Sequence, residues 1–221
     1  RRLNEQILAE TRERYAIPPD GLAELGGFES FIYGFTQNGS QYILRLGHSL
    51  RRSPDLIQGE VDWINHLAEG GAGVARAVNS SAGNLVELIP DGLGEYFLAT
   101  AFLRAAGGSV WQNGGWTEKF MGDYGRLLGK MHALTRQYTV PHPAWKRPQW
   151  DDPIMTDTTS ALPEIDPRAM ALAQANLAYL RQLPTPPHAF GLIHQDAHTG
   201  NLFVDENGRI TLFDFDDCVY G

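Results

Sequence analysis

The sequence feature that most constrains the fold is the polar segment HQDAHTGN (194–201), which separates two short apolar runs. The runs, AFGLI (189–193) and LFV (202–204), have the length and composition of buried strands. A plain turn could join two strands, yet this loop holds two histidines, an aspartate and an asparagine within eight positions. The acidic stretch FDFDD (213–217) follows a dozen residues later. The pattern predicts a site rich in metal-binding and proton-accepting side chains.

The residues around this loop predict a small sheet. The apolar runs at 189–193 and 202–204 and a third run that reaches residue 216 form a strand–loop–strand–turn–strand pattern. The turn is DENG (205–208), whose residue types favour turns because Asp and Asn hydrogen-bond to nearby backbone and Gly tolerates positive φ. We therefore expect one small sheet at the end of this sequence.

The first hundred residues have the pattern of a sheet with one internal helix. The segment 26–47 predicts a β-hairpin, because Asn38 and Gly39 tolerate the positive φ angles of a two-residue turn. Ser53 and Pro54 are the residue types that begin a helix, here expected over 54–69. A further helix is expected over 3–15, and strands over 73–78, 84–89 and 95–102.

Helical patterns dominate the remainder. Helices are predicted over 117–136 and, after an Asp166-Pro167 cap, to about residue 181, while five prolines within 141–165 predict an irregular segment between them. A run of strands followed by a run of helices is typical of an α+β fold, here in two lobes. We place the N-terminal lobe at residues 1–103 and the C-terminal lobe at residues 104–221.

Composition excludes several classes of partner. The net charge of −8 argues against a general nucleic-acid surface, which needs clustered Lys and Arg. No apolar run approaches the ~20 residues that cross a bilayer, so we expect no membrane partner. The single cysteine, Cys218, fits a cytoplasmic location. Arg1 at the start, and Gly221 so soon after the acidic stretch, indicate a piece of a longer protein; the oligomeric state is not indicated.

Asp196, Asn201 and Asp214 carry the chemistry that we infer. A loop carboxylate can accept the proton of an attacking hydroxyl, and an amide oxygen five residues later can bind magnesium together with a carboxylate on the next strand. This arrangement suits phosphoryl transfer, in which the protein mainly positions groups and neutralises charge. Asp and Asn also favour turns for their own hydrogen bonds, but three at this spacing beside buried strands need a further explanation.

HQDAHTGN and LFDFDD (212–217) resemble the motifs of the aminoglycoside phosphotransferase and choline kinase-like family, whose members are related to protein kinases and phosphorylate small molecules. The family typically shows H-G-D-x-x-x-x-N and then a strand that ends in I-D-x, and Gln195 stands here in place of the usual glycine. The resemblance covers most of the chain. It implies a two-lobed protein kinase-like fold that uses ATP and Mg²⁺.

The same resemblance assigns roles by position. Asp196 would be the catalytic base, Asn201 and Asp214 would be the magnesium ligands, and His194 would orient the loop. The implied function is transfer of the γ-phosphate of ATP to a hydroxyl of a small molecule. The resemblance allows an aminoglycoside, choline, homoserine or a sugar as the acceptor.

The N-terminal lobe fits the family more loosely. GGFESF (26–31) resembles the turn over the ATP phosphates, and FLATAFLRA (97–105) would supply the strand and linker that receive adenine. YILRL (42–46) occupies the strand on which the family usually has a lysine; here Arg45 keeps the charge, with Glu60 as its expected ion-pair partner. The nucleotide-binding residues implied by the resemblance are Gly27, Ser30, Arg45, Glu60, Phe102 and Leu103.

Two other functions stay open on the sequence. A kinase-like module could hold a nucleotide without transferring phosphate, and Arg45 is the best argument for it; an intact set of Asp196, Asn201 and Asp214 argues against it. A metal-dependent hydrolase is also conceivable, because His194-x-Asp196-x-His198 superficially resembles a zinc or two-metal cluster. In that case Asn201 would have no role.

Overall fold

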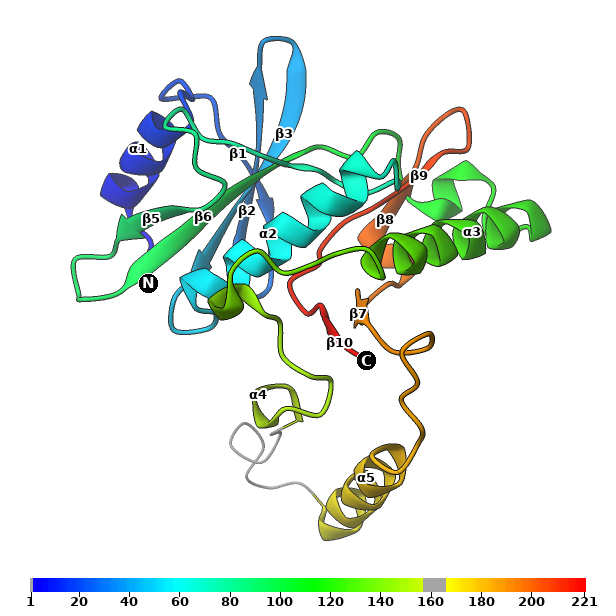
Figure 1. Cartoon of the computed structure of the whole chain (residues 1–221). Helices are drawn as coiled ribbons and strands as arrows, with labels where there is room; N and C mark the ends of the chain where they lie inside the picture. Colours follow the sequence, from blue (N-terminus) through cyan, green and yellow to red (C-terminus); the bar gives the residue numbers. More distant parts are fainter. Residues whose placement is uncertain (1, 157–165) are drawn as a thin grey trace.

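The computed structural model describes residues 2–156 and 166–221. Its elements form an antiparallel sheet with two flanking helices, followed by a mainly helical part with two small two-stranded sheets (Figure 1). This is the α+β fold that was predicted. The predicted irregular segment 141–165 lies partly outside the described residues; its described part contains only the short helices η2 (Pro143–Trp145) and α4 (Pro153–Thr156).

The large sheet is built from six strands in the order β1-β2-β3-β6-β4, with β5 also paired to β6. Its strand pairs within the described residues are antiparallel. This arrangement places β3, the strand that carries Arg45, at the centre with both edges paired. The strands are β1 (Ala23–Gly26), β2 (Phe31–Gln37), β3 (Ser40–His48), β4 (Ala77–Val78), β5 (Glu87–Pro90) and β6 (Tyr96–Leu103).

The predicted hairpin is confirmed as β2 and β3. Its two-residue turn consists of Asn38 at φ 51° and Gly39 at φ 77°, and Gln37 pairs with Ser40 on either side. Positive φ at both central positions matches the right-handed twist of the strands. The strand β1, which precedes the hairpin, was not predicted.

Two predicted strands were too long, because part of each segment has a different hydrogen-bond partner or a backbone conformation that a strand does not adopt. The segment predicted as a strand over 73–78 pairs with the sheet only at Ala77 and Val78. Its first half turns to the C-terminal region instead, where Ala75 N–H donates to the carbonyl of Leu212 at 2.9 Å. The strand predicted to reach residue 216 ends at Leu212, because Asp214 has a φ of 64° that no regular strand adopts.

The predicted single small sheet is two separate ladders. β8 (Leu202–Val204) pairs with β9 (Ile210–Leu212) across the predicted turn, as expected. However, β7 (Leu192–Ile193) pairs with β10 (Val219–Tyr220), a strand that was not predicted. The loop between β7 and β8 therefore does not connect neighbours in one sheet, and its short helix η3 (Thr199–Asn201) redirects the chain.

The long helices begin at side-chain caps that the sequence indicates. Ser53 accepts a hydrogen bond from the amide of Leu56, and Thr117 accepts one from that of Phe120. The predicted helix boundaries agree with the structure to within a few residues. The helices are α1 (Glu5–Arg14), α2 (Pro54–Glu69), α3 (Glu118–Thr135) and α5 (Pro167–Leu180), with the short helix η1 (Val110–Asn113) before α3. None of the four long helices, nor any other helix of the described residues, could span a membrane.

Two apolar cores divide the molecule, and α2 belongs to the second. The first core joins α1 to the sheet and includes Ile7, Leu44 and Phe97. The second packs Trp63 and its neighbours on α2 against α3 and the C-terminal strands. Trp63 is fully buried, and its Nε1–H donates to Thr135 Oγ1 at 3.1 Å. The helix that follows β3 is therefore fixed to the C-terminal part as well as to the sheet (Figure 1).

We propose the lobe boundary at residue 103, as the sequence suggested. β6 ends at Leu103, and the next element, η1, begins at Val110. The first apolar core draws on residues that precede this point, whereas the second draws mostly on residues that follow it. The helix α2 is the element that both lobes share.

One glycine shows how closely the C-terminal part approaches α2. A Cβ atom on Gly59 would lie 1.9 Å from the carbonyl oxygen of Trp145. Because that atom belongs to the backbone, it cannot move aside as a side chain would. By contrast, a Cβ atom on Gly129 of α3 would meet no described atom within 4 Å.

We predict opposite effects of alanine at these two helical glycines. Gly59→Ala should lower the free energy of unfolding by about 1–3 kcal/mol, because the overpacked helix must separate from residue 145. Gly129→Ala should raise it by up to about 1 kcal/mol, because alanine favours the helix. Urea unfolding of the three proteins measures both effects. An unchanged stability of Gly59→Ala would contradict the close approach.

Candidate active site

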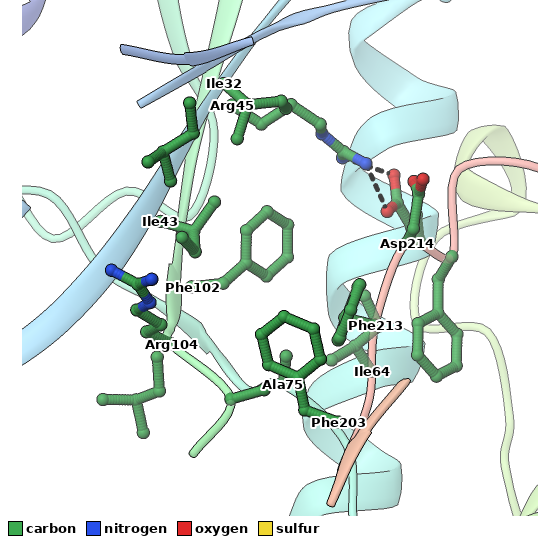
Figure 2. A pocket seen from close by; sticks show the side chains of 15 residues that line it. Ile32, Ile43, Arg45, Ile64, Ala75, Phe102, Arg104, Phe203, Phe213 and Asp214 are labelled. Atoms are coloured by element: carbon green, nitrogen blue, oxygen red, sulfur yellow. Dashed lines mark hydrogen bonds and ion pairs between the residues drawn. The ribbon is translucent and has the colours of Figure 1, made fainter. Parts of the chain in front are cut away.

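A largely apolar pocket of about 260 Å³ lies where the large sheet, α2 and the C-terminal strands meet. Arg45 and Asp214 lie close together on one side of it, and Arg104 lies on the opposite side, with Phe102 and Phe203 between them (Figure 2). The pocket therefore suits a flat apolar group joined to an anionic one. Its lining comprises Leu25, Ile32, Ile43, Arg45, Glu60, Ile64, Ala75, Phe102, Leu103, Arg104, Ala105, Phe203, Phe213, Asp214 and Phe215.

Arg45 on β3 and Glu60 on α2 form a buried ion pair with two hydrogen bonds. Nη1 donates to Oε1 at 2.8 Å, and Nη2 donates to Oε2 at 2.7 Å. Nε donates to Thr100 Oγ1 at 3.3 Å, and the guanidinium lies 5.2 Å from the ring centroid of Phe102. Within the described residues these contacts occupy three of the five N–H groups of an arginine, so two can face an anion.

The charge of Arg45 is maintained by its surroundings. Burial alone would lower the pKa of the guanidinium, but the charges of Glu60, Asp216 and Asp214 outweigh burial and raise that pKa above its ordinary value. The structure thus brings together the two residues that the sequence paired. Their contact with a nucleotide stays a prediction.

His194 connects the polar loop to the segment that carries Asp214. Its Nε2 lies 3.0 Å from the carbonyl oxygen of Phe213, and its Nδ1 accepts the amide of Asp196 at 3.3 Å. A carbonyl only accepts, so Nε2 carries the proton and the ring is neutral. Burial lowers the pKa of this imidazole, which agrees with the neutral form. The predicted loop-orienting position of His194 is thus what the structure shows.

Asn201 is held by the loop that it closes. Its Nδ2 donates to the carbonyl oxygen of Asp196 at 3.0 Å and to Oδ2 of the same residue at 2.9 Å. Since both amide hydrogens have acceptors, Oδ1 is the atom left to meet a cation. The carbonyl of Asn201 accepts the amide of Phe213 at 2.9 Å, so Asn201 lies directly beside the segment that leads to Asp214.

The Asp196 carboxylate faces solvent on its other side. Its side chain is half exposed, and Oδ2 lies 3.5 Å from Nε2 of His198. The hydroxyl of Tyr124 on α3 donates to the carbonyl of Ala197, which ties the loop to this helix. A carboxylate that is oriented by an amide and still open to solvent can approach an incoming hydroxyl.

Asp214 occupies an unusual backbone conformation. Its φ is 64°, in the left-handed region that non-glycine residues seldom adopt. This conformation ends β9 and brings the carboxylate to the pocket side facing Arg45 (Figure 2). Although Asp214 is exposed, nearby protein desolvates it enough to raise the pKa of its carboxyl, an effect that Arg45 partly offsets.

Gly27 and Ser30 lie in the loop between β1 and β2. Gly27 has a φ of 124°, and a Cβ atom there would lie 2.0 Å from the carbonyl oxygen of Ser30, so the loop requires glycine at this position. Ser30 borders a small cavity together with Arg45, Gly47 and other residues. Phe102 and Leu103, at the end of β6, both line the large pocket. Of the six residues expected around a nucleotide, five therefore line the pocket or the adjacent cavity, and Gly27 lies in the same loop as Ser30.

Sequence reasoning did not single out Arg51 and Arg52, which pair with acidic residues beside the pocket. Arg51 joins Glu29 of the loop to Asp216, and Arg52 Nη2 donates to Asp217 Oδ1 at 2.6 Å. These ion pairs link the start of α2 to the acidic stretch after Asp214. The adjacent arginines before the Ser53 cap were the available signal, because two neighbouring charges beside a helix start need anionic partners.

The donor set fits a hard cation that is only partly held by protein. Among the described residues, no group of three or more His, Cys, Asp or Glu side chains is arranged to hold a metal ion. Magnesium accepts one or two protein oxygens and takes its other ligands from phosphate and water. The oxygens of Asn201 and Asp214 fit that requirement, whereas a zinc site needs a fuller set of protein ligands.

Residues 23–221 match the model of the phosphotransferase enzyme family. The chain belongs to this family. Amicoumacin kinase of Bacillus subtilis (strain 168) is 38% identical over 216 residues, which is 98% of this chain and 64% of that relative. The family assignment agrees with the resemblance carried by the loop motif and favours phosphoryl transfer over hydrolysis at a zinc centre.

Solved structures show the same fold. The amicoumacin kinase hAmiN in complex with AMP-PNP, Ca²⁺ and Ami has a TM-score of 0.90 at 34% identity, over 100% of this chain and 66% of that one. A microcompartment-associated aminopropanol kinase has a TM-score of 0.68 at 24% identity, over 99% and 71% of the two chains. The predicted kinase-like fold is therefore confirmed. The chain spans about two thirds of the length of the amicoumacin kinases that it matches.

We predict that His194 makes stability depend on pH. Because burial lowers its pKa in the folded chain, its contribution is fully present above about pH 6.5, the ordinary pKa of histidine, and is lost as the pH falls below that value. Thermal unfolding between pH 7.5 and 5.5 should show a smaller change for His194→Gln than for the wild type. The exposed His142→Gln is the control. Equal slopes for His194→Gln and the wild type would contradict a neutral, buried role.

Proposed function

We propose that this protein transfers the γ-phosphate of ATP to a hydroxyl of a small molecule, with the help of a divalent cation such as Mg²⁺. The observation that carries the proposal is the meeting of Arg45–Glu60 and Asp214 at one pocket, with Asp196 and Asn201 tied to the same segment through His194 and Phe213. Family membership supports the reaction class. The complex of hAmiN with AMP-PNP and Ca²⁺ supports the choice of nucleotide and of a divalent cation.

The apolar part of the pocket would receive the adenine ring. Phe102 and Phe203 offer flat apolar surfaces, and Leu103 lies where β6 passes into the linker. The two N–H groups of Arg45 that Glu60 and Thr100 leave available would bind the α- and β-phosphates. The loop that contains Gly27 and Ser30 would cover the phosphates with backbone N–H groups.

The metal residues and the base complete the assignment. Asn201 Oδ1 and the Asp214 carboxylate would hold the cation, which when bound neutralises charge on the β- and γ-phosphates. Asp196 would orient the acceptor hydroxyl and accept its proton as the oxygen bonds to phosphorus. Asn201 would keep that carboxylate pointed at the acceptor through its Nδ2.

For the acceptor, we propose amicoumacin as the first candidate, because a relative with 38% identity is named for its phosphorylation. Aminoglycosides, aminopropanol, choline, homoserine and simple sugars complete the panel. The test is release of ADP with each acceptor in the presence and absence of Mg²⁺, together with mass measurement of the acceptor. Nucleotide binding without transfer to any acceptor would favour the binding-module alternative.

We predict that Asp196→Ala nearly abolishes transfer and leaves nucleotide binding largely intact. Loss of a general base lowers the turnover rate by at least about 10²-fold, because the hydroxyl proton then has no acceptor. Single-turnover kinetics and AMP-PNP calorimetry measure the two effects. Asp123→Ala, a change at an exposed ion pair on α3, is the control. Wild-type turnover by Asp196→Ala would overturn the assignment.

We predict that Asp214→Asn weakens binding of the metal–nucleotide complex. Asparagine tolerates the left-handed backbone at this position, so the change removes charge with little strain. The Mg²⁺ concentration for half-maximal AMP-PNP binding should rise roughly tenfold or more, since even indirect partners of a metal have effects of that size. If the variant needed no more Mg²⁺ than the wild type, Asp214 would not be a ligand.

A further inference from the structure

The proline-rich segment that the sequence left unexplained lies between two parts of the proposed active site. We call residues 142–150 the strap. On one side its Trp145 carbonyl lies against Gly59 of α2. On the other side, the amide of Trp150 donates to the carbonyl oxygen of Tyr220 at 2.7 Å, and the amide of Tyr220 donates to the carbonyl oxygen of Pro148 at 2.9 Å. The strap therefore contacts both α2 and the chain that follows Asp214.

Arg147, within the strap, connects these parts through its buried side chain. The residue is 3% exposed. Its Nη2 donates to the carbonyl oxygen of Asp216 at 2.6 Å, and its Nε donates to that of Cys218 at 2.8 Å. Its Nη1 donates to the carbonyl oxygen of Leu56 at 3.0 Å. One guanidinium thus joins the turn after Asp214 to the first turns of α2.

The groups that accept hydrogen bonds from Arg147 indicate that this side chain positions the backbone. A buried guanidinium is ordinarily paired with a carboxylate, because desolvating an isolated charge is costly. Within the described residues, the hydrogen bonds of Arg147 go instead to three backbone carbonyls in two separate segments. Such bonds fix the path of the chain and leave the nearby carboxylates available for other partners.

The two segments lead directly to residues of the proposed site. Asp216 lies two residues after Asp214, and Leu56 lies one helical turn before Glu60. Because Asp214 has a strained backbone with φ at 64°, the turn that follows it must be held from outside to keep that conformation. Arg147 donates two hydrogen bonds to this turn, and its third, to Leu56, ties the turn to α2.

We propose that Arg147 is a positioning residue for phosphoryl transfer: it sets the Asp214 carboxylate in register with the Arg45–Glu60 pair. The proposal rests on the proposed function, since it requires a cation at Asp214. Arg147 is not among the residues that line the pocket. It acts through the backbone of residues 216–218 and of α2.

The test is Arg147→Lys, which retains the charge but not the fork of donors. AMP-PNP binding is measured by calorimetry with and without Mg²⁺. We expect the Mg²⁺ concentration for half-maximal binding to rise roughly tenfold, in the range known for residues that orient metal ligands, and metal-free binding to change much less. The control is Arg126→Lys at an exposed ion pair on α3, which should match the wild type.

A purely structural role gives a different result. In that case the melting temperature of Arg147→Lys falls while its Mg²⁺ requirement equals that of the wild type, and the proposal is overturned. If Arg147→Lys does not fold, the same Mg²⁺ dependence is measured for Gly59→Ala, which disturbs the contact between the strap and α2. Gly129→Ala is its control. A raised Mg²⁺ requirement in Gly59→Ala supports the proposal, and an unchanged one overturns it.

The design also separates this proposal from the proposed function. If the wild-type protein binds AMP-PNP no more tightly with Mg²⁺ and phosphorylates no acceptor, both the proposed function and the role of Arg147 are overturned. If the wild type binds more tightly with Mg²⁺ and phosphorylates an acceptor, but Arg147→Lys has the same Mg²⁺ dependence, only the role of Arg147 is overturned.

Discussion

The buried pair of Arg45 and Glu60 is the interaction on which the arrangement of this molecule depends. Two charges removed from water are stable only when their geometry satisfies both, and here two hydrogen bonds of 2.7 and 2.8 Å do so. This requirement fixes α2 against the central strand β3. Because the apolar side of α2 is buried in the second core, the same pair also fixes where the C-terminal strands lie relative to the sheet.

The polar loop shows a second principle: the side chains that we propose to be catalytic are held by backbone contacts rather than by one another alone. His194 uses both ring nitrogens on backbone groups, and Tyr124 binds a loop carbonyl. Asn201 commits its amide hydrogens to Asp196. The oxygens to which we assign a role, on Asp196 and Asn201, thus remain available, although the groups that carry them have little freedom.

Much of this could be predicted from the sequence because the signals are local. The Asn38-Gly39 turn, the caps of the long helices and the spacing within HQDAHTGN each depend on adjacent residues. The errors arose where distant segments meet. The pairing of β7 with β10 and the pairing of Ala75 with Leu212 leave no periodic pattern. The same is true of Arg147, whose acceptors are backbone carbonyls of ordinary residues.

Gln195, which stands where the family motif has glycine, shows how stability and catalytic activity can make opposite demands on the backbone. Gln195 has a φ of 69°, close to that of Asp214, and both lie in a region that disfavours side chains by about 1–2 kcal/mol. Glycine at the first of these sites would relax the backbone there. At the second site glycine would also relax it, but would delete the carboxylate. Under the role proposed for Asp214, selection for heat resistance alone would replace this residue, and only selection that includes turnover would retain it.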